Sequence, residues 1–327
     1  MDITILMLGG SRRVSLAELF QRSGKRLGYN VRILAYELDT RAPIALVGKV
    51  IKGLKWSDPN VVDDIVRVVK EYDVNIILPF VNGAMEIAAL CKARLPEVFV
   101  PVSDYDLSEK LYDKIEAARL FKEAGIPIPR TYSILDNEMP AIAKPRRGSR
   151  SRGIKIFNDV DDLMHLENLD DYIIQEYIGN TREYTVDCYV SLSGELLTAV
   201  PRERLEIMGG ESTRTVTCRL PELLDLTRKV IESFPFRGPV TIQFLHDLDT
   251  DRFLLLEVVT RLGGGVICSI YAGAPITDYI LSEALGIPVS PCDDWADNVL
   301  MARYWKEAIF YNATPPDGVA PRSENWL

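Results

Sequence analysis

Six side chains of the sequence have types and positions that suit a nucleotide triphosphate and its magnesium ion. Four lie in or beside short apolar stretches typical of β-strands, namely Glu176, Glu183, Gln243 and Glu257. The other two are the lysines Lys114 and Lys144. Charged groups are rarely buried unless they are paired or bound to a cation. Together with a loop rich in glycine, arginine and serine, these residues predict binding of a magnesium-chelated triphosphate, and hence an ATP-driven ligase.

The loop Lys144–Gly153 follows an apolar stretch that predicts a strand over residues 141–145. Gly148 and Gly153 allow the backbone to turn tightly and to approach a ligand closely. Backbone N–H groups in such a loop, with the hydroxyls of Ser149 and Ser151, can cradle phosphate oxygens. The lysine precedes the glycines, so the loop is not of the G-x-x-x-x-G-K-[ST] type. The alternative is a basic hairpin tip exposed to water.

The segment Gln175–Glu183 links two expected strands. Glu176 ends the first strand and Glu183 begins the second. The link would present a backbone edge to a planar base, with Glu183 placed to accept hydrogen bonds from ribose hydroxyls. The alternative is an ordinary pair of solvated strand ends.

Gln243 and Glu257 lie on two expected strands that are joined by the turn Asp247–Arg252. Both side chains can face one side of a sheet, and both offer oxygen atoms. Magnesium prefers oxygen ligands and usually completes its shell with water and substrate phosphates. The alternative for Glu257 is a buried salt bridge, for example to Arg261.

The composition excludes several other classes of protein. The net charge of −9 argues against general nucleic-acid binding. No apolar run reaches the roughly 18 residues that span a bilayer, so no membrane association is expected. With only two histidines, a multi-histidine zinc site is excluded and a Ser/His/Asp triad is disfavoured. The five cysteines form no C-x-x-C pair, and the first ten residues make a poor signal peptide, so a cytoplasmic protein with reduced thiols is expected.

The order of expected elements predicts an α/β protein in which the pattern of strands and helices changes part-way along the chain. Up to about residue 100, strands alternate with helices, which implies a parallel sheet with helices on both faces. A single helix is expected over residues 107–124, with Asp106 and Glu109 spaced as a capping box. Later strands are mostly joined by hairpin-like turns and are expected at residues 141–145, 153–157, 172–178, 184–191, 195–200, 214–219, 239–246 and 253–259. Helices at about 221–233 and 275–285 are expected to cover this later sheet.

Taken together, these segments resemble the ATP-grasp superfamily, and within it the single-copy relatives of the carbamoyl-phosphate synthetase large chain. The resemblance extends over nearly the whole chain. The stretch Asp113–Tyr132 looks like that family's entry helix, and Gly263–Gly265 with Tyr271–Pro275 also fits. It implies a Rossmann-like N-terminal domain with a parallel sheet over residues 1–105. A two-lobed ATP-grasp domain with antiparallel sheets would follow, with its small lobe at 106–183 and its large lobe at 184–327.

The resemblance also implies roles for individual residues. Lys114 and Lys144 match the two basic residues that contact ATP. The stretch Gln175-Glu176-Tyr177-Ile178 resembles the adenine hinge, in which backbone at Glu176 and Ile178 would contact the base. Glu183 falls seven positions beyond Glu176, as the ribose-binding glutamate does in the family.

Gln243 and Glu257 match the family's two magnesium ligands, and Arg261 matches the arginine that faces the transferred phosphoryl group. Arg261 and Lys144 are therefore the expected catalytic residues. One position departs from the family pattern Glu-x-Asn-x-Arg, because the chain has Val259 where the asparagine would help to hold a second magnesium ion. Valine has no atom that coordinates a metal, so either one magnesium ion suffices, or another residue or water replaces the asparagine, or turnover is weak.

By this resemblance the chain would use ATP and Mg²⁺ to activate a small carboxylate as an acylphosphate. An amine would then attack, with release of ADP and phosphate. Planar guanidinium groups bind carboxylates bidentately. The candidates for binding the acceptor are therefore mostly arginines, together with two loop glycines: Arg202, Arg204, Arg214, Arg261, Gly264 and Gly265. For Arg202 and Arg204 the alternative is a surface strand of alternating charge. A homodimer is expected by analogy only.

Three other functions stay open at this point. The first is carbamoyl-phosphate-type chemistry on bicarbonate, against which the single ATP-grasp unit argues. The second is a nucleotide-binding protein with weakened or lost catalysis, for which Val259 is the main support. The third is a nicotinamide dehydrogenase, which rests only on the first strand and the Gly9-Gly10 turn.

Overall fold

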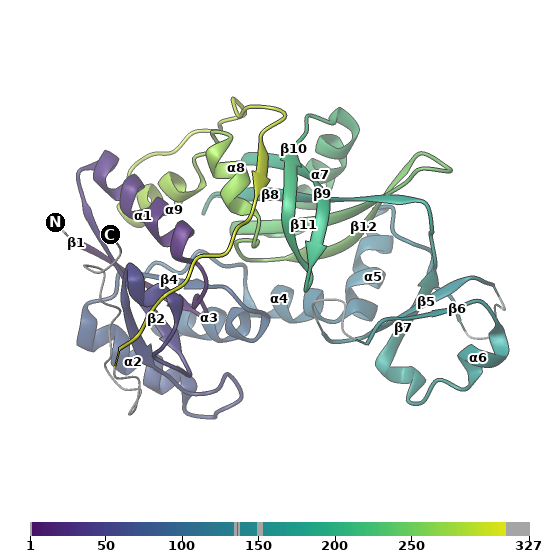
Figure 1. Cartoon of the computed structure of the whole chain (residues 1–327), viewed down its shortest axis with the longest axis horizontal. Helices are drawn as coiled ribbons and strands as arrows, with labels where there is room; N and C mark the ends of the chain where they lie inside the picture. Colours follow the sequence, from purple (N-terminus) through teal and green to yellow (C-terminus); the bar gives the residue numbers. More distant parts are fainter. Residues whose placement is uncertain (1, 134–135, 137, 149–152, 312–327) are drawn as a thin grey trace.

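The computed structural model describes residues 2–133, 136, 138–148 and 153–311. It contains three sheets, which appear along the long axis of the molecule in Figure 1. The N-terminal sheet is parallel, and the two later sheets are antiparallel. This arrangement confirms the predicted fold class.

The parallel sheet has the strand order β3-β2-β1-β4. Its strands are β1 Asp2–Leu8, β2 Asn30–Glu37, β3 Lys49–Lys52 and β4 Ile76–Pro79. The elements that connect them are α1 Val14–Leu27, the 3-10 helix η1 Pro43–Leu46 and α2 Val61–Tyr72, while α3 Asn82–Arg94 follows β4. Successive residues of β1 point to opposite faces, so Ile5 packs in the same core as α1, and Leu6 in the same core as α2 and α3. Both faces are therefore covered, as apolar parallel strands require.

Two helices lead from the parallel sheet to the rest of the chain, namely α4 Tyr105–Tyr112 and α5 Lys114–Glu123. The prediction of one continuous helix over 107–124 is wrong, because the helix is interrupted at Asp113. The Asp113 side chain accepts hydrogen bonds from the backbone N–H groups of Ile115 (3.1 Å) and Glu116 (3.4 Å), and so caps α5. The predicted capping box is also not formed, because α4 begins after Asp104 without a side-chain cap.

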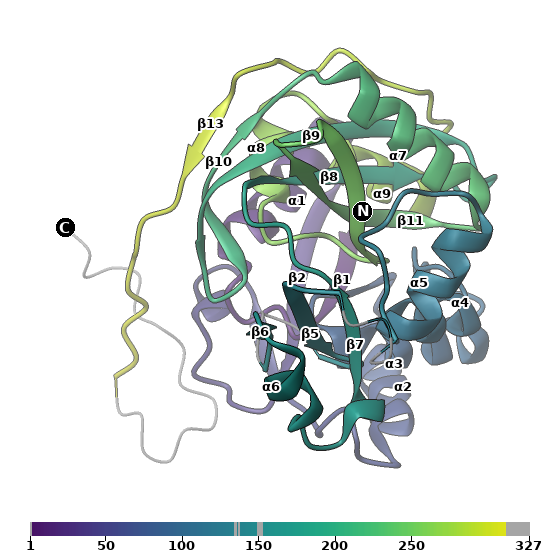
Figure 2. The ribbon, with the colours of Figure 1, turned by 90° about the vertical axis from the view of Figure 1, so that its right-hand side faces the viewer.

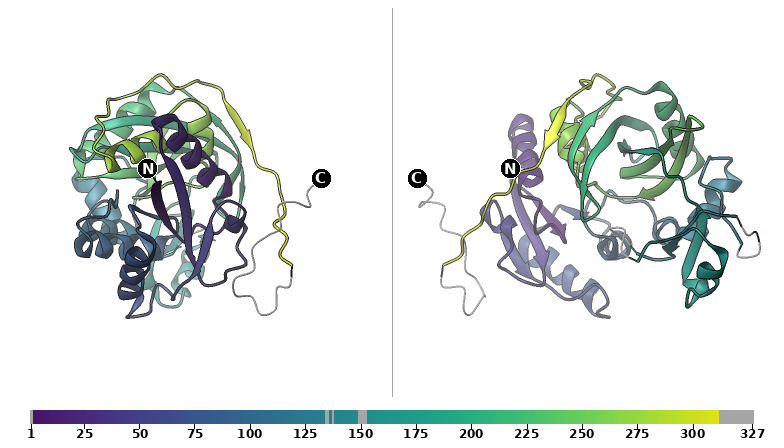
Figure 3. Two further views of the ribbon diagram at one scale, coloured as in Figure 1. Left: turned by 90° about the vertical axis from the view of Figure 1, so that its left-hand side faces the viewer. Right: turned by 45° about the vertical axis from the view of Figure 1, so that its right-hand side comes forward.

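The small sheet has the order β6-β5-β7 and lies at the opposite end of the molecule from the parallel sheet (Figures 1 and 3). Its elements are β5 Ala141–Pro145, β6 Lys155–Phe157, α6 Val160–Met164, the 3-10 helix η3 Leu169–Asp171 and β7 Tyr172–Glu176. Its buried apolar residues form a small cluster of their own: Ala141, Ala143, Leu163, Leu166 and Ile174. This sheet therefore has a separate core from the rest of the chain.

The large sheet has the order β12-β11-β8-β9-β10-β13. Its strands are β8 Thr181–Val190, β9 Leu196–Met208, β10 Glu211–Thr217, β11 Gly238–Asp247, β12 Arg252–Val259 and β13 Leu300–Ala302. Figure 2 shows β13 beside β10 at the outer edge of the sheet. The accompanying helices are α7 Pro221–Ser233, α8 Val266–Tyr271 and α9 Ile276–Ala284. The sheet is larger than predicted, because β9 continues to Met208 and β13 joins the edge.

The parallel sheet and the C-terminal helices share one core. Residues of β1 and α1 are buried in the same cluster as Ile276, Ile280 and Trp295. Polar contacts support this packing, since Ser23 and Thr277 share a hydrogen bond (2.8 Å) and Arg26 pairs with Asp278 (2.8 Å). Within the described ranges, every helix is too short or too polar to span a lipid bilayer.

Candidate nucleotide-binding site

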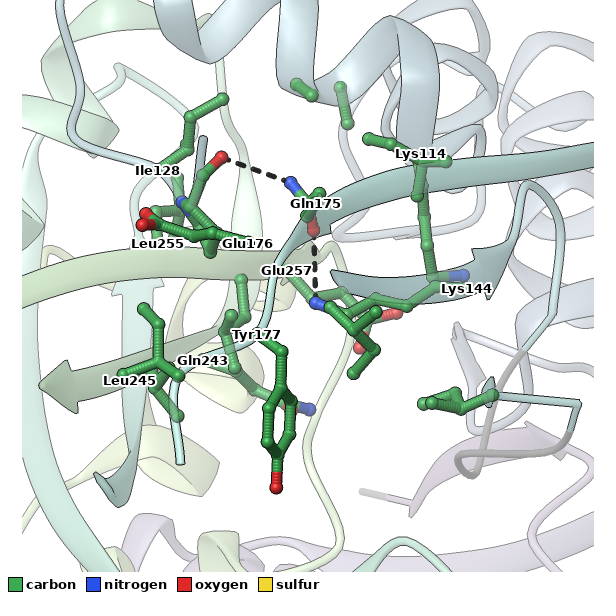
Figure 4. A pocket seen from close by; sticks show the side chains of 18 of the residues that line it. Lys114, Ile128, Lys144, Gln175, Glu176, Tyr177, Gln243, Leu245, Leu255 and Glu257 are labelled. Atoms are coloured by element: carbon green, nitrogen blue, oxygen red, sulfur yellow. Dashed lines mark hydrogen bonds between the residues drawn. The ribbon is translucent and has the colours of Figure 1, made fainter. Parts of the chain in front are cut away.

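A cavity of about 390 Å³ lies between the small sheet and the large sheet. This volume is within the range of small-molecule and cofactor sites. Figure 4 shows its side chains, which come from α5, from the small sheet and from the strands of the large sheet. Eleven of the residues singled out in the sequence line it: Lys114, Lys144, Gly148, Gln175, Glu176, Tyr177, Ile178, Glu183, Arg204, Gln243 and Glu257. The structure therefore brings together side chains that are far apart in the sequence.

The two lysines project into this cavity from different elements. Lys144 is on β5, and its Nζ donates a hydrogen bond to Oε1 of Gln175 (3.1 Å, Figure 4). Lys114 is at the start of α5, and its Nζ donates to the carbonyl oxygen of Gly148 (3.0 Å). Burial, and secondly the charge of Lys114, lower the pKa of Lys144 to about 8, although Glu183 and Glu257 oppose the shift. Two ammonium groups held close together in a buried place favour an anionic ligand.

The break between α4 and α5 determines where Lys114 lies. Asp113 is buried, and its carboxylate pairs with Nε of Arg146 at 2.6 Å. The backbone N–H of Lys114 donates to the carbonyl oxygen of Arg146 (3.0 Å). Asp113 therefore caps α5 and also ties the helix to the end of β5, which brings Lys114 and Lys144 to one side of the cavity.

The predicted adenine hinge forms one edge of the cavity. The backbone N–H of Glu176 donates to the carbonyl oxygen of Arg130 (2.9 Å), and that of Tyr177 donates to Pro140 (3.1 Å). The Glu176 carboxylate in turn accepts from the Arg130 backbone N–H (2.9 Å). Because these groups fix the chain, Glu176 does not offer its own N–H to a base. Ile142 and Leu255 add apolar surface beside the hinge, and nothing in the sequence distinguishes them from other core residues.

Arg204 connects the predicted ribose and metal residues. Its Nη1 donates to Oε2 of Glu183 (2.7 Å) and to Oε1 of Gln243 (3.1 Å). The strand order explains this contact, because β8 lies between β9 and β11. The structure therefore places Arg204, predicted to bind the acceptor, among the residues expected to hold the nucleotide.

Gln243 and Glu257 are directly opposite each other on β11 and β12. A bulge after Gln243 shifts the pairing there, and such bulges re-aim side chains. Among the described residues, no group of three or more His, Cys, Asp or Glu side chains forms a self-sufficient metal site. The pair nevertheless fits magnesium, which often takes one or two carboxylates and completes its shell with phosphates and water. Val259 is 5% exposed and packs in the sheet, opposite Thr241.

The structure corrects the predicted role of Arg202. This side chain is 1% exposed, and its Nε pairs with Oδ2 of Asp187 at 2.7 Å. A substrate does not reach a guanidinium group so deeply buried. The carboxylate of Asp187 also accepts a hydrogen bond from Ser269 Oγ (2.6 Å), so Arg202 belongs to a buried polar network beneath the segment Gly263–Gly265, which we call the glycine-rich loop.

Other predicted residues lie outside the cavity lining. Arg214 is exposed on β10, and Gly153 adopts a left-handed backbone (φ 75°) against Pro145. Arg261 donates through Nη2 to Oδ1 of Asn82 (3.2 Å), at the start of α3. Gly264 and Gly265 follow Arg261 in the same loop. Ser149 and Ser151 lie outside the described residues.

A family model described as "ATP-grasp in the biosynthetic pathway with Ter operon" matches residues 168–304. A second model, of the tubulin-tyrosine ligase family, matches residues 110–180. The C-terminal section of the carbamoyl phosphate synthase large chain from Methanopyrus kandleri is 24% identical over 291 residues, which cover 80% of this chain. Over residues 168–304 the chain is therefore similar to the ATP-grasp family. It spans 51% of the length of that M. kandleri protein.

Solved structures of ATP-grasp proteins have the same fold. The biotin carboxylase domain of the Hydrogenobacter thermophilus 2-oxoglutarate carboxylase, a dimer with MgADP, ADP and bicarbonate, superposes with a TM-score of 0.72. It is 16% identical, and the match covers 91% of this chain and 73% of that one. The ADP complex of the Staphylococcus aureus N5-carboxyaminoimidazole synthetase gives a TM-score of 0.71 at 18% identity, with coverage of 89% and 80%. At these identities, the likeness shows only that this chain and the two solved structures share a fold.

Proposed function

We propose that this chain is an ATP-dependent ligase that joins a small carboxylate to an amine. ATP phosphorylates the carboxylate, and the amine attacks the resulting acylphosphate, so that ADP and phosphate leave. The observation that carries the proposal is the convergence of Lys114, Lys144, Glu183 and Glu257 on one cavity. Relatives described with ADP, MgADP and bicarbonate support the same assignment.

The residues of the cavity have distinct tasks in this proposal. Lys144 and Lys114 neutralise the phosphates, and Glu183, oriented by Arg204, accepts hydrogen bonds from the ribose. The adenine base lies against the hinge Gln175–Ile178. Because phosphoryl transfer involves little covalent work by the protein, positioning and charge neutralisation supply most of the rate enhancement.

Glu257 and Gln243 are the residues that would hold magnesium. The ion would supply charge neutralisation on the phosphoryl oxygens. Oε1 of Gln243 accepts one hydrogen bond from Arg204, and the second lone pair of this oxygen would be the one that binds the ion. Val259 offers no metal ligand, and the proposal therefore includes a single protein-held magnesium ion.

We also propose which residue faces the phosphoryl group as it passes from ATP to the acceptor. Arg261 follows β12, the strand that carries Glu257, and donates to Asn82 at the start of α3; it would face the transferred phosphoryl group. We propose that the chain has three parts, an N-terminal domain at residues 1–105, a small lobe at 106–183 and a large lobe at 184–327. We also propose that it forms a homodimer, as the biotin carboxylase relative does, and that it is cytoplasmic, which the five free cysteines favour.

The test is ADP formation with magnesium, ATP and a panel of amino acids and small carboxylates. We expect Lys144→Ala and Glu257→Ala to keep the fold, by circular dichroism, and to lose at least about 100-fold in ADP formation, as positioned charges typically contribute this much. Lys122→Ala, on the exposed face of α5, is the matched control. Unchanged turnover in both site variants would overturn the assignment.

Two alternatives give different results in the same assay. Bicarbonate as the acceptor would stimulate ADP formation without any added carboxylate. A binding-only protein, which Val259 favours, would bind ATP without any acceptor-stimulated ADP formation.

A further inference from the structure

A second group of charged side chains lies outside the nucleotide cavity. Nη2 of Arg13 pairs with Oε1 of Glu211 at 3.0 Å, and Nη1 of Arg303 pairs with Oε2 of the same carboxylate at 2.9 Å. Nη1 of Arg13 is 3.5 Å from Oε2. Arg13 follows β1, Glu211 begins β10, and Arg303 follows β13. Three distant parts of the chain therefore meet at one carboxylate.

The side chains are only partly shielded from solvent. Arg13 is 15% exposed, Glu211 31% and Arg303 34%. Burial alone would raise the pKa of Glu211, but Arg13 and Arg303 lower it, so the carboxylate is charged at neutral pH. Two guanidinium groups thus share one carboxylate, which leaves one positive charge in excess. A group of this kind can accept a further anion.

The glycine-rich loop forms one wall of this group. Arg303 Nη2 donates a hydrogen bond to the carbonyl oxygen of Gly264. A Cβ atom on Gly264 would be 2.8 Å from Oε2 of Glu211 and 3.2 Å from Nη2 of Arg303. The backbone therefore approaches the carboxylate more closely than any side-chain-bearing residue would allow. This loop directly follows Arg261, which the proposed function places at the phosphoryl group.

The β9–β10 hairpin links the group to the nucleotide cavity. Arg204, which contacts Glu183 and Gln243 in the cavity, also donates through Nη2 to the carbonyl oxygen of Gly210 (2.9 Å). Its Nε donates to Oγ of Ser212 (3.2 Å). Gly210 and Ser212 flank Glu211. Arg204 thus contacts both neighbours of Glu211 in the chain and two residues that line the nucleotide cavity.

We propose that Arg13 and Arg303 form the binding site for a carboxylate of the acceptor, and that Glu211 occupies this site as an internal counter-ion until the acceptor displaces it. The inference rests on the proposed function and names the substrate class of its acceptor side. Neither arginine was singled out by the sequence, because each follows a different strand and neither belongs to a motif. The site favours acceptors with a second acidic group, since one carboxylate is phosphorylated while another stays between the guanidinium groups.

The experiment uses succinate as the probe and isothermal titration calorimetry on the full chain. Glu211→Gln keeps the shape of the side chain but removes the counter-ion charge. We expect Glu211→Gln to bind succinate at least tenfold more tightly than the wild type. The double variant Arg13→Gln with Glu211→Gln should lose that gain. Asp278→Asn, which removes a carboxylate paired with Arg26 elsewhere, is the control and should leave succinate affinity unchanged.

Equal affinity of wild type and Glu211→Gln for succinate would overturn the inference, as would a gain that survives Arg13→Gln. Thermal unfolding of each variant confirms that it is folded. ATP binding is measured on the same samples. If the wild type does not bind ATP, the proposed function is contradicted. If it binds ATP but the expected differences in succinate affinity are not seen, only the acceptor site is contradicted.

Discussion

Lys144 shows how a buried charge can report ligand binding. Its pKa lies at about 8 because burial, and then Lys114, disfavour the charged form. A bound triphosphate favours that charged form, so binding is accompanied by proton uptake when the pH is above 8.

We therefore expect the affinity for ATP to fall by up to about tenfold per pH unit above pH 8. The measurement is a set of ATP titrations between pH 7 and 9.5. Lys144→Met should bind weakly with little dependence on pH, and Lys122→Met, on the same helix as Lys114, should behave as the wild type. A flat profile for the wild type would contradict the assignment of Lys144 to the phosphates.

Glu37, at the end of β2, is a second perturbed group. Burial raises its pKa to about 7, although a backbone hydrogen bond from Ser11 partly opposes the shift. One of its carboxylate oxygens is buried without a hydrogen-bond partner. The folded state therefore binds the proton more tightly than the unfolded state does. The contribution of protonated Glu37 to stability is fully present below pH 4.5 and is lost as the pH rises through 7.

The expected result is that Glu37→Gln gains on the order of 2 kcal/mol of unfolding free energy over the wild type between pH 5 and pH 8. Urea unfolding at both pH values measures this difference. The exposed Glu97→Gln serves as the control. If the difference in unfolding free energy between Glu37→Gln and the wild type is the same at both pH values, the folded state does not raise the pKa of Glu37.

At the scale of elements, the break between α4 and α5 is the feature that places the first lysine. Asp113 caps α5, and its carboxylate also pairs with Arg146 at the end of β5. Asp113→Ala should cost about 1–2 kcal/mol of stability, because it removes the cap of α5 and the ion pair between the buried Asp113 carboxylate and the partly exposed Arg146.

The same change should weaken ATP binding about tenfold, because Lys114 would no longer be held beside Lys144. Chemical unfolding and ATP titration measure the two effects. Asp159→Ala removes the cap of the short helix α6, where Asp159 accepts from the Asp161 N–H (2.7 Å), and should cost only about 1 kcal/mol with no effect on ATP. An Asp113→Ala variant with normal ATP affinity would mean that the helix break does not position the site.

The sequence predicted the elements best where local signals were strong. The helix expected at about 221–233 matches α7, which has Pro221 in its first turn, and the strands of the large sheet follow from runs of apolar and β-branched residues. The break at Asp113 was missed because Asp106 and Glu109 offered a competing cap at a matching spacing. The edge strand β13 was missed because its three residues have no periodicity to detect.

The site was predictable in part for the same reason. Lys114, Lys144, Glu183, Gln243 and Glu257 are polar residues in apolar surroundings, which makes them conspicuous in the sequence. Arg202 has the same signal, yet its partner Asp187 is 15 positions away, and only the pairing of strands shows that the two neutralise each other. Arg13, Glu211 and Arg303 are brought together by tertiary packing alone, so no sequence pattern marks them.

At the scale of the whole molecule, we expect the N-terminal sheet and the C-terminal helices to unfold together. They share a core that includes Ile280, which is fully buried. Ile280→Ala should therefore lower the stability of both parts together, by about 2–4 kcal/mol.

We expect a single unfolding transition for this variant when far-UV circular dichroism is compared with tryptophan fluorescence. Ile156→Ala, at an exposed position of the small sheet, should have little effect on that transition. Two separated transitions in Ile280→Ala would show instead that the parallel sheet is stable without the C-terminal helices.

The small sheet has a core of its own, and hydrogen bonds tie it to α5 from Lys114 and Arg146. Because this core is separate, we expect the small sheet to move as a unit when nucleotide enters and leaves the cavity. If the small sheet must move outward before ADP can leave, the release of ADP would be the rate-limiting step of turnover. A mutation that weakens the contacts between the small sheet and α5 would then raise kcat and at the same time lower the affinity for nucleotide.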